Sequence, residues 1–217
     1  MKIYRLPNKT EALIFDMDLT LYSHEEYGRI QIDTIVAMAG KKLGKSFEDI
    51  NAELEACRVS WAASHGGKKP SLSNIILSWG FTMEDIIKWR EEAYDPENYL
   101  KEDPLLRKVL LGLSKYKLGI VTNNPVSIAK RTLVCLGVED CFITLVGLDT
   151  CRVPKPSRLP FEKISELLQV TPDVCVSIGD RFDIDLKFPL EMGMGAIQVD
   201  GAEDVYKLPE ALKQEYK

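Results

Sequence analysis

The sequence has few of the residues that build zinc sites, disulfide frameworks and serine-type triads. It contains two histidines, His24 and His65, and five cysteines that are widely spaced and form no CxxC pair. Two histidines give poor support for a catalytic zinc or a Ser-His-Asp triad, and an odd number of scattered cysteines is typical of reduced, mostly buried thiols. We therefore expect a cytoplasmic protein whose chemistry, if any, depends on other side chains.

Long apolar runs and clustered positive charge are also missing. No run approaches the roughly 20 apolar residues that span a bilayer, and residues 1–7 lack the apolar stretch of a signal peptide. The formal net charge is -5, and charges of both signs are interspersed along the chain. We therefore expect neither a membrane partner nor a nucleic-acid partner.

The chain does contain short runs rich in Ile, Val and Leu that alternate with helix-like segments. The runs are apolar on both sides, which is typical of strands in a buried parallel sheet. Strands alternating with helices predict right-handed crossovers and an α/β fold with a doubly wound parallel sheet. The predicted strands are Ala12–Phe15, Leu118–Val121, Phe142–Val146, Val174–Ile178 and Ala196–Val199. The predicted helices are Leu105–Tyr116, Val126–Leu136, Leu159–Leu168 and Ile184–Met192.

The interval between the first and second predicted strands has a different pattern. Residues 23–97 contain several amphipathic segments and no convincing strand. Ser46 and Thr82 are each followed three residues later by an acid, which is a helix-start signal, and the glycine-rich stretch 66–70 interrupts the pattern. We therefore expect an insertion of about four helices in the first crossover.

Polar residues follow the ends of several predicted strands. The first strand ends in Asp16 and Asp18, the second runs into Thr122, the fourth runs into Asp180, and Lys155 lies between prolines after the third. Each residue alone has a structural explanation, such as a helix cap, a turn or a solvated loop charge. Ligands bind beyond the carboxyl ends of strands in open parallel sheets, so the set as a whole predicts a functional site there.

In this order, the segments resemble the haloacid dehalogenase (HAD) superfamily, specifically its phosphatases. The resemblance covers nearly the whole chain. It rests on DMDLT at Asp16–Thr20, on Thr122, on Lys155-Pro156 and on GDRFDID at Gly179–Asp185.

The resemblance implies a domain division and a strand order. A Rossmann-like core would comprise residues 1–22 and 98–217, and residues 23–97 would form an all-helical cap of the type called C1. The implied strand order is 5-4-1-2-3, so the first predicted strand lies between the second and the fourth. Asp16, Thr122 and Asp180 would then converge on one point.

The acidic residues of this set also require a cation. Asp16, Asp18, Asp180 and Asp185 would repel one another if all were ionised around one site. A divalent ion relieves the repulsion, and oxygen-only ligands favour Mg²⁺ over zinc. The resemblance implies that the carboxylates of Asp16 and Asp180 and the carbonyl of Asp18 hold the ion. Asp185, or alternatively Asp183, would lie behind these ligands and hold them in place without binding the ion itself.

The resemblance further implies a separate role for each of these residues in catalysis. Asp16 would attack phosphorus and form an aspartyl-phosphate, while Asp18 would donate and then accept a proton. Thr122 and the backbone N–H of Asn123 would bind phosphoryl oxygens, and Lys155 would neutralise charge. The expected activity is Mg²⁺-dependent hydrolysis of a small-molecule phosphate monoester, by a monomer or a homodimer.

Three other functions remain open at this stage. A phosphomutase would share the core but protect the aspartyl-phosphate from water. A phospho-acceptor receiver domain would be about half this length and would lack a helical insertion. A non-catalytic binding protein has no need of the complete catalytic set.

The substrate is less well defined than the reaction. The segments Phe15–Tyr22, Asn98–Pro104 and Leu136–Phe142 resemble the pyrimidine 5′-nucleotidase branch. The histidine often found in that branch after the second motif is absent, because Ile128-Ala129 stands there. Nucleoside monophosphates, phosphoglycolate and sugar phosphates therefore all remain candidates.

Overall fold

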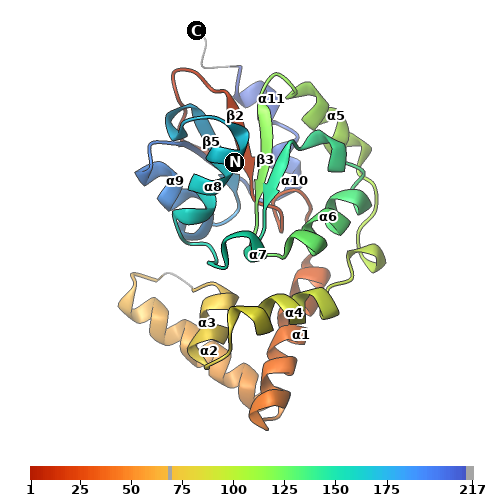
Figure 1. Cartoon of the computed structure of the whole chain (residues 1–217), viewed down its shortest axis with the longest axis vertical. Coiled ribbons are helices and arrows are strands. Elements are labelled where there is room, and N and C mark those ends of the chain that lie inside the picture. Colours follow the sequence, from red (N-terminus) through yellow and green to blue (C-terminus); the bar gives the residue numbers. More distant parts are fainter. Residues whose placement is uncertain (68–69, 214–217) are drawn as a thin grey trace.

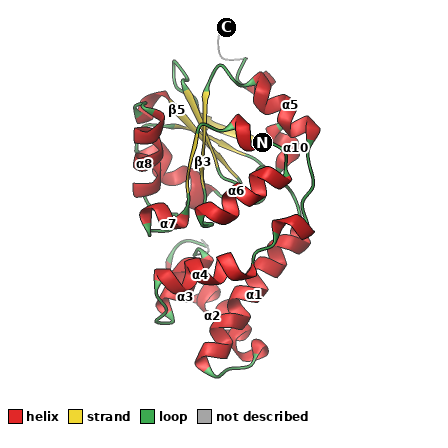
Figure 2. Cartoon of the chain, turned by 45° about the vertical axis from the view of Figure 1, so that its right-hand side comes forward, coloured by secondary structure: helices red, strands yellow, loops and turns green. Residues whose placement is uncertain are grey.

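A central sheet organises the chain in the computed structural model, which describes residues 1–67 and 70–213. The described sheet has six strands in the order β1-β6-β5-β2-β3-β4, and helices flank it on both sides (Figures 1 and 2). The strands are β1 (Lys2–Arg5), β2 (Ala12–Phe15), β3 (Lys117–Val121), β4 (Thr144–Val146), β5 (Cys175–Gly179) and β6 (Gly195–Gln198).

The centre of the sheet is buried on both faces. Strand β2 runs parallel to β3 on one side and to β5 on the other. Successive side chains of a strand point to opposite faces, so Leu13 and Phe15 enter one apolar cluster while Ala12 and Ile14 enter the other. This arrangement confirms the predicted doubly wound parallel sheet, with the first predicted strand between the second and the fourth.

Helices cover both faces of the sheet. Helix α8 packs its apolar residues against the Ile14 face, and helices α5, α6 and α11 contribute to the cluster on the Leu13 face. The α-helices that follow the insertion are α5 (Pro104–Gly112), α6 (Val126–Cys135), α7 (Leu148–Cys151), α8 (Leu159–Leu168), α9 (Lys187–Glu191), α10 (Ala202–Val205) and α11 (Leu208–Ala211). The shorter turns are η1 (Pro96–Asn98), η2 (Glu139–Cys141), η3 (Pro172–Val174) and the π-helical turn η4 (Phe182–Leu186).

Two parts of the sheet region differ from the sequence prediction. Strand β1 was not predicted, because its mostly exposed residues lack the apolar run of a buried strand; it pairs antiparallel with β6 at the edge of the sheet. The predicted helix Ile184–Met192 is divided into η4 and α9. Pro189 has no N–H to donate, and it is tolerated because α9 begins only two residues before it.

The insertion forms the helices α1 (Glu25–Leu43), α2 (Phe47–Ser64), α3 (Leu72–Ser78) and α4 (Met83–Ala93), here called the cap. Both predicted start signals cap a helix. The Ser46 hydroxyl accepts a hydrogen bond from the N–H of Asp49 at 3.1 Å, and Thr82 forms a capping box with Asp85. Of the predicted break at 66–70, Lys68 and Lys69 lie outside the described residues.

The cap lies at one end of the core, beside α7, in both views (Figures 1 and 2). Helix α4 is the cap helix that bonds the loop after β3, through Arg90. The cap therefore covers the end of the sheet at which the parallel strands finish. Within residues 1–67 and 70–213, no helix combines the length and apolar character needed to cross a membrane.

Candidate active site

Asp16 is fixed by the sheet itself. It directly follows β2, and its backbone N–H continues the ladder by donating to the carbonyl of Ile178 at 2.8 Å. The chain then turns sharply, with Leu19 in the left-handed region at φ 58°. The turn brings the buried hydroxyl of Thr20 back to donate to Asp16 Oδ2 at 3.2 Å. The DMDLT segment thus forms a tight loop around the Asp16 carboxylate.

Lys155 is buried against this carboxylate. Its ammonium group donates to Asp16 Oδ1 at 2.6 Å, to Asp185 Oδ1 at 2.6 Å and to the Val121 carbonyl at 2.9 Å. Burial alone would lower the pKa of Lys155, but the two carboxylates raise it above its usual value. Because all three N–H donors have acceptors, Lys155 presents mainly a fixed positive charge to the site.

Three carboxylates meet at the same point. Oxygen atoms of Asp16, Asp180 and Asp185 lie within 4.8 Å of one another. Burial, followed by the neighbouring carboxylates, raises the pKa of Asp16 to about 8 even though Lys155 opposes the shift. Burial and the charge of Asp185 raise the pKa of Asp180 to about 6. A crowded, oxygen-only donor set of this kind suits a hard divalent cation such as Mg²⁺.

The structure places Asp185, and not Asp183, in the acidic cluster of the described residues. Asp185 belongs to the acidic cluster, is 2% exposed and pairs with Lys155, whereas Asp183 is outside that cluster of described residues. The π-helical turn η4 turns the Asp185 side chain inward, where its Oδ2 accepts the N–H of Arg181 at 3.1 Å. Gly179 makes room, because a Cβ there would lie 2.5 Å from the Cβ of Asp185.

The loop after β3 carries Thr122, Asn123 and Asn124. The Thr122 hydroxyl accepts the backbone N–H of Asn124 at 3.1 Å. The Asn123 side chain holds the Lys155 backbone from both directions, accepting its N–H at 2.7 Å and donating to its carbonyl at 3.1 Å. Asn123 therefore positions the lysine loop, a contact that the sequence pattern did not predict.

The Asp18 carboxyl is held by two residues that the prediction did not single out. The Tyr22 hydroxyl donates to Oδ1, and the Asn124 amide donates to Oδ2 at 2.8 Å. Burial, reinforced by the Asp18 charge, raises the pKa of Tyr22 well above its usual value, so Tyr22 stays a neutral donor. The position of Tyr22, four residues after Asp18 at the end of the same loop, is the one local signal that could have indicated this contact.

These groups open onto a cleft of about 550 Å³ between the core and the cap. The core side of its lining includes Asp16, Asp18, Asn123, Lys155 and Asp180, while Thr122 and Asp185 are not part of it. The cap contributes Arg29 and Arg58 as well as apolar side chains such as Leu54. The cleft therefore has room for a small molecule beside the loop that follows β2.

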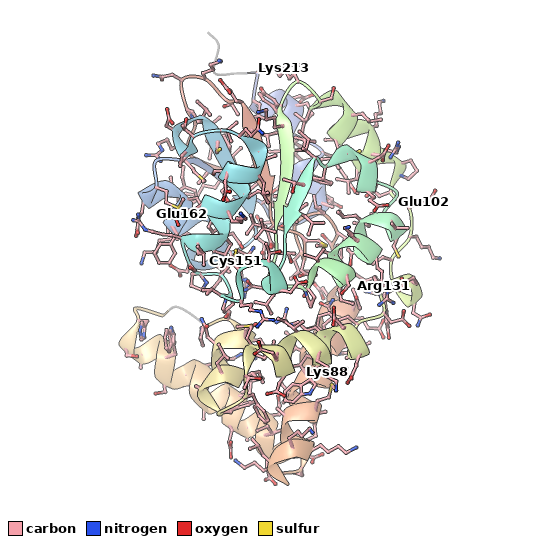
Figure 3. All side chains as sticks on the ribbon, in the orientation of Figure 1. Lys88, Glu102, Arg131, Cys151, Glu162 and Lys213 are labelled. Atoms are coloured by element: carbon pink, nitrogen blue, oxygen red, sulfur yellow. The ribbon has the colours of Figure 1, made fainter. Side chains whose placement is uncertain are left out.

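The segment that leaves the cap is anchored to the core by Arg131. Figure 3 shows Arg131 where α6 meets the segment after α4. Its guanidinium donates to both carboxylate oxygens of Glu97, at 2.7 and 2.6 Å, and to the Tyr94 carbonyl at 3.1 Å. A bidentate guanidinium–carboxylate pair has a defined direction as well as charge, so it fixes the return of the chain to the core.

A parallel α/β sheet with an acidic cluster, a buried lysine and a helical cap at its carboxyl end defines a hydrolase site of one known kind. The haloacid dehalogenase-like hydrolase family matches residues 10–193 of the chain. The chain therefore belongs to this family.

Two curated proteins are similar to this chain in sequence. Glyceraldehyde 3-phosphate phosphatase of Methanopyrus kandleri is 28% identical over 199 residues, which are 87% of this chain and 83% of the relative. Phosphoglycolate phosphatase of Colwellia psychrerythraea is 32% identical over 84 residues, which are 39% of this chain and 37% of the relative. Both relatives are named as phosphatases, and within the haloacid dehalogenase-like hydrolase family this chain is therefore a phosphatase.

A solved structure shows the same fold. The HAD phosphatase from Thermococcus onnurineus matches with a TM-score of 0.60 and 21% identity, covering 94% of this chain and 98% of that one. The alignment includes the cap as well as the core, because it covers nearly the whole of both chains.

Proposed function

We propose that the protein hydrolyses a small-molecule phosphate monoester with the help of Mg²⁺ and through a phosphorylated Asp16. In this proposal residues 1–22 and 98–217 form the catalytic core, and residues 23–97 form the cap that closes over the substrate. The observation that carries the proposal is the convergence of Asp16, Asp180 and Asp185 within 4.8 Å, beside the buried Lys155 and a cleft.

The carboxylates of Asp16 and Asp180, with the carbonyl of Asp18, would hold Mg²⁺. When bound, the ion would neutralise charge that otherwise keeps an anionic ester away from an anionic nucleophile. Lys155 contributes a second, permanent positive charge at 2.6 Å from Asp16. Asp185 holds Lys155 from its other side, also at 2.6 Å, and so keeps that charge in place.

In the first step a carboxylate oxygen of Asp16 attacks phosphorus, and the bond from phosphorus to the leaving oxygen breaks. Asp18 donates its proton to that oxygen, so an alcohol leaves and Asp18 becomes a carboxylate. Thr122 and the backbone N–H of Asn123 would bind the phosphoryl oxygens while charge builds up on them.

In the second step Asp18 takes a proton from water, and the resulting hydroxide attacks the phosphorus of phosphorylated Asp16. The bond between Asp16 and phosphorus breaks, inorganic phosphate leaves, and Asp16 is again a carboxylate. The Tyr22 and Asn124 contacts keep the Asp18 carboxyl close to the reacting atoms in both steps.

The substrate class rests on the cleft and on the relatives. Glyceraldehyde 3-phosphate and phosphoglycolate appear in the relatives' names, and a cleft of about 550 Å³ also has room for a sugar phosphate or a nucleoside monophosphate. All four compounds are small phosphate monoesters, which is the class proposed here.

The test is phosphate release from a panel of esters, comprising these four classes and an aryl phosphate. We expect phosphate release in the presence of Mg²⁺. Release should stop when a chelator is added and return when Mg²⁺ is restored. Asp16→Asn is expected to lower turnover by at least about 10⁴-fold, because it removes the nucleophile. Mass spectrometry of the acid-quenched wild-type enzyme should find one phosphoryl group on Asp16.

Asp173→Asn is the matched control, since Asp173 is an exposed aspartate in η3, outside the cleft. It should release phosphate like the wild type. Folded wild-type protein that releases no phosphate from any ester would overturn the proposal. Transfer of the phosphoryl group within a substrate, with a bisphosphate activator and little release, would identify a phosphomutase instead.

A further inference from the structure

The carboxyl group of Asp18 is held in one orientation by donors on two sides. Tyr22 donates to Oδ1, and Asn124 donates to Oδ2 at 2.8 Å. Both donors are buried, with Tyr22 5% and Asn124 2% exposed. A buried polar group without a partner is costly. The carboxyl therefore cannot turn away without leaving two donors unsatisfied.

The orientation of the Asn124 amide is set in turn by the cap. Arg90 of α4 donates from Nη1 to Asn124 Oδ1 at 2.8 Å and to the Asn123 carbonyl at 2.5 Å. A guanidinium group can only donate, so the amide oxygen of Asn124 faces Arg90 and its NH₂ group faces Asp18. The cap therefore orients the amide so that its NH₂ group, and not its oxygen, contacts Asp18.

Arg90 is itself fixed within the cap. Its Nη2 donates to the Ser73 hydroxyl of α3 at 3.1 Å, and its side chain is 6% exposed. Among the described residues Arg90 has no carboxylate partner, so its hydrogen-bond acceptors are neutral groups of α3 and of the loop after β3. Helix α4 lies on the side of the cap nearest the core (Figure 1), which brings Arg90 to that loop.

We propose that Arg90 and Asn124 are positioning residues that link the closed cap to Asp18. The inference rests on the proposed function, because the orientation of Asp18 matters only if Asp18 transfers a proton. When the cap moves away, Arg90 leaves, the Asn124 amide is free to rotate and Asp18 loses a fixed donor. Proton transfer to the leaving group is thereby confined to the closed cleft.

The leaving group distinguishes this link from a merely structural contact. An alkoxide needs a proton as it departs, whereas a nitrophenolate is stable without one. The ratio kcat/KM reports the steps up to departure of the leaving group. A variant that disturbs only the proton donor therefore loses activity in proportion to the basicity of the leaving group.

The experiment measures kcat/KM for a series of substituted phenyl phosphates and one alkyl phosphate, with wild type, Arg90→Ala and Asn124→Leu. Both variants should lose about 10- to 100-fold on the alkyl ester and no more than about 3-fold on nitrophenyl phosphate. The double variant should lose no more activity than either single variant, because both substitutions break the same link.

Glu84→Gln is the matched control. Glu84 also belongs to α4 and forms a different cap–core contact, an ion pair with Arg152, which does not reach Asp18. This variant should show the wild-type dependence on the leaving group. Thermal unfolding of each variant shows whether it is folded, and Asn124→Leu decides the question alone if Arg90→Ala does not fold.

An equal loss across all esters in the folded variants would overturn the link and leave the proposed phosphatase mechanism standing. Additive losses in the double variant would overturn it as well. Failure of the proposed function has a different signature, because the wild-type protein would then release no phosphate from any ester.

Discussion

The sheet core and the helical cap bury their apolar residues in different ways. In the core, β2 is buried along its whole length and is packed on both faces. In the cap, α2 buries Ile50 and Leu54 while Val59 and Trp61 remain exposed. The core thus holds the acidic cluster on a frame packed from both faces. The cap is a thinner layer that meets the core through polar contacts and through a shared apolar cluster, in which Ile86 and Trp89 of the cap join Ile128 of α6 and Leu148 of α7.

This difference matches the division of tasks in the proposed reaction. Transfer of a phosphoryl group requires several groups fixed within a fraction of an ångström, and strands buried on both faces provide that precision. Admission of substrate requires an element that can move. The cap is attached through the polar contacts of Arg90, Glu84 and Glu91 and through the apolar cluster with α6 and α7, none of which involves a strand, so it can separate without unfolding the sheet.

Among the substitutions that compare the core with the cap, the largest effect is expected from breaking the packing around Asp185. Gly179→Ala places a methyl group 2.5 Å from the Cβ of Asp185, which cannot remain beside Lys155. We expect kcat to fall by about 10²-fold or more, since small displacements at a catalytic centre have effects of this size. Steady-state kinetics on the preferred ester measures the change. Wild-type turnover in Gly179→Ala would contradict the assigned role of Asp185.

A smaller effect is expected from truncating one isoleucine in each region. Ile14 of β2 and Ile50 of α2 are both fully buried. Ile14→Ala should lower the free energy of unfolding by about 3–5 kcal/mol, because neighbouring strands cannot close the cavity. Ile50→Ala should cost about 2 kcal/mol, because α2 has one exposed side and can shift inward.

Urea unfolding of both variants measures these costs. Hydrogen exchange shows where they act, with faster exchange in α1 and α2 for Ile50→Ala and unchanged exchange in β2 and β3. Equal costs, or faster exchange throughout the sheet in Ile50→Ala, would show that cap and core unfold as one unit.

The smallest effect is expected at a glycine of the cap. Gly28 lies inside α1, and a Cβ there would meet no neighbouring atom within 4 Å. Gly28→Ala should stabilise α1 by about 0.5–1 kcal/mol, because glycine is a poor helix former. Differential scanning calorimetry should show a rise in melting temperature of about 2 °C. A rise confined to a separate early transition would show that the cap melts independently, whereas a fall would indicate an unrecognised contact at Gly28.

Much of the core was predictable because its signals are local. The apolar runs that became β2, β3 and β5 are each four or five residues long, and a parallel sheet places their carboxyl ends at one edge. The order of the predicted strands and the HAD family are confirmed. The catalytic roles of Asp16, Asp18, Thr122, Lys155 and Asp180 stay predictions, and the experiments above test the reaction that depends on them.

The contacts that complete the site were not predictable, because they join segments far apart in the chain. Arg90 occupies an ordinary position in an amphipathic helix, yet it lies 34 positions before its partner Asn124. Asn124 in turn lies 106 positions after Asp18. Strand β1 was missed for another reason, since an exposed edge strand needs no apolar run.

The sequence by itself determined the class of fold, the helical insertion and the residues at the strand ends, because hydrophobic pattern and residue type act locally. Only the tertiary structure decided that Asp185 and not Asp183 joins the acidic cluster. It also decided that Tyr22 and Asn124 hold Asp18 and that Arg90 holds Asn124. The physical reason is that a hydrogen bond depends on distances and directions of atoms. Packing of the whole chain sets those distances, and no short stretch of sequence contains them.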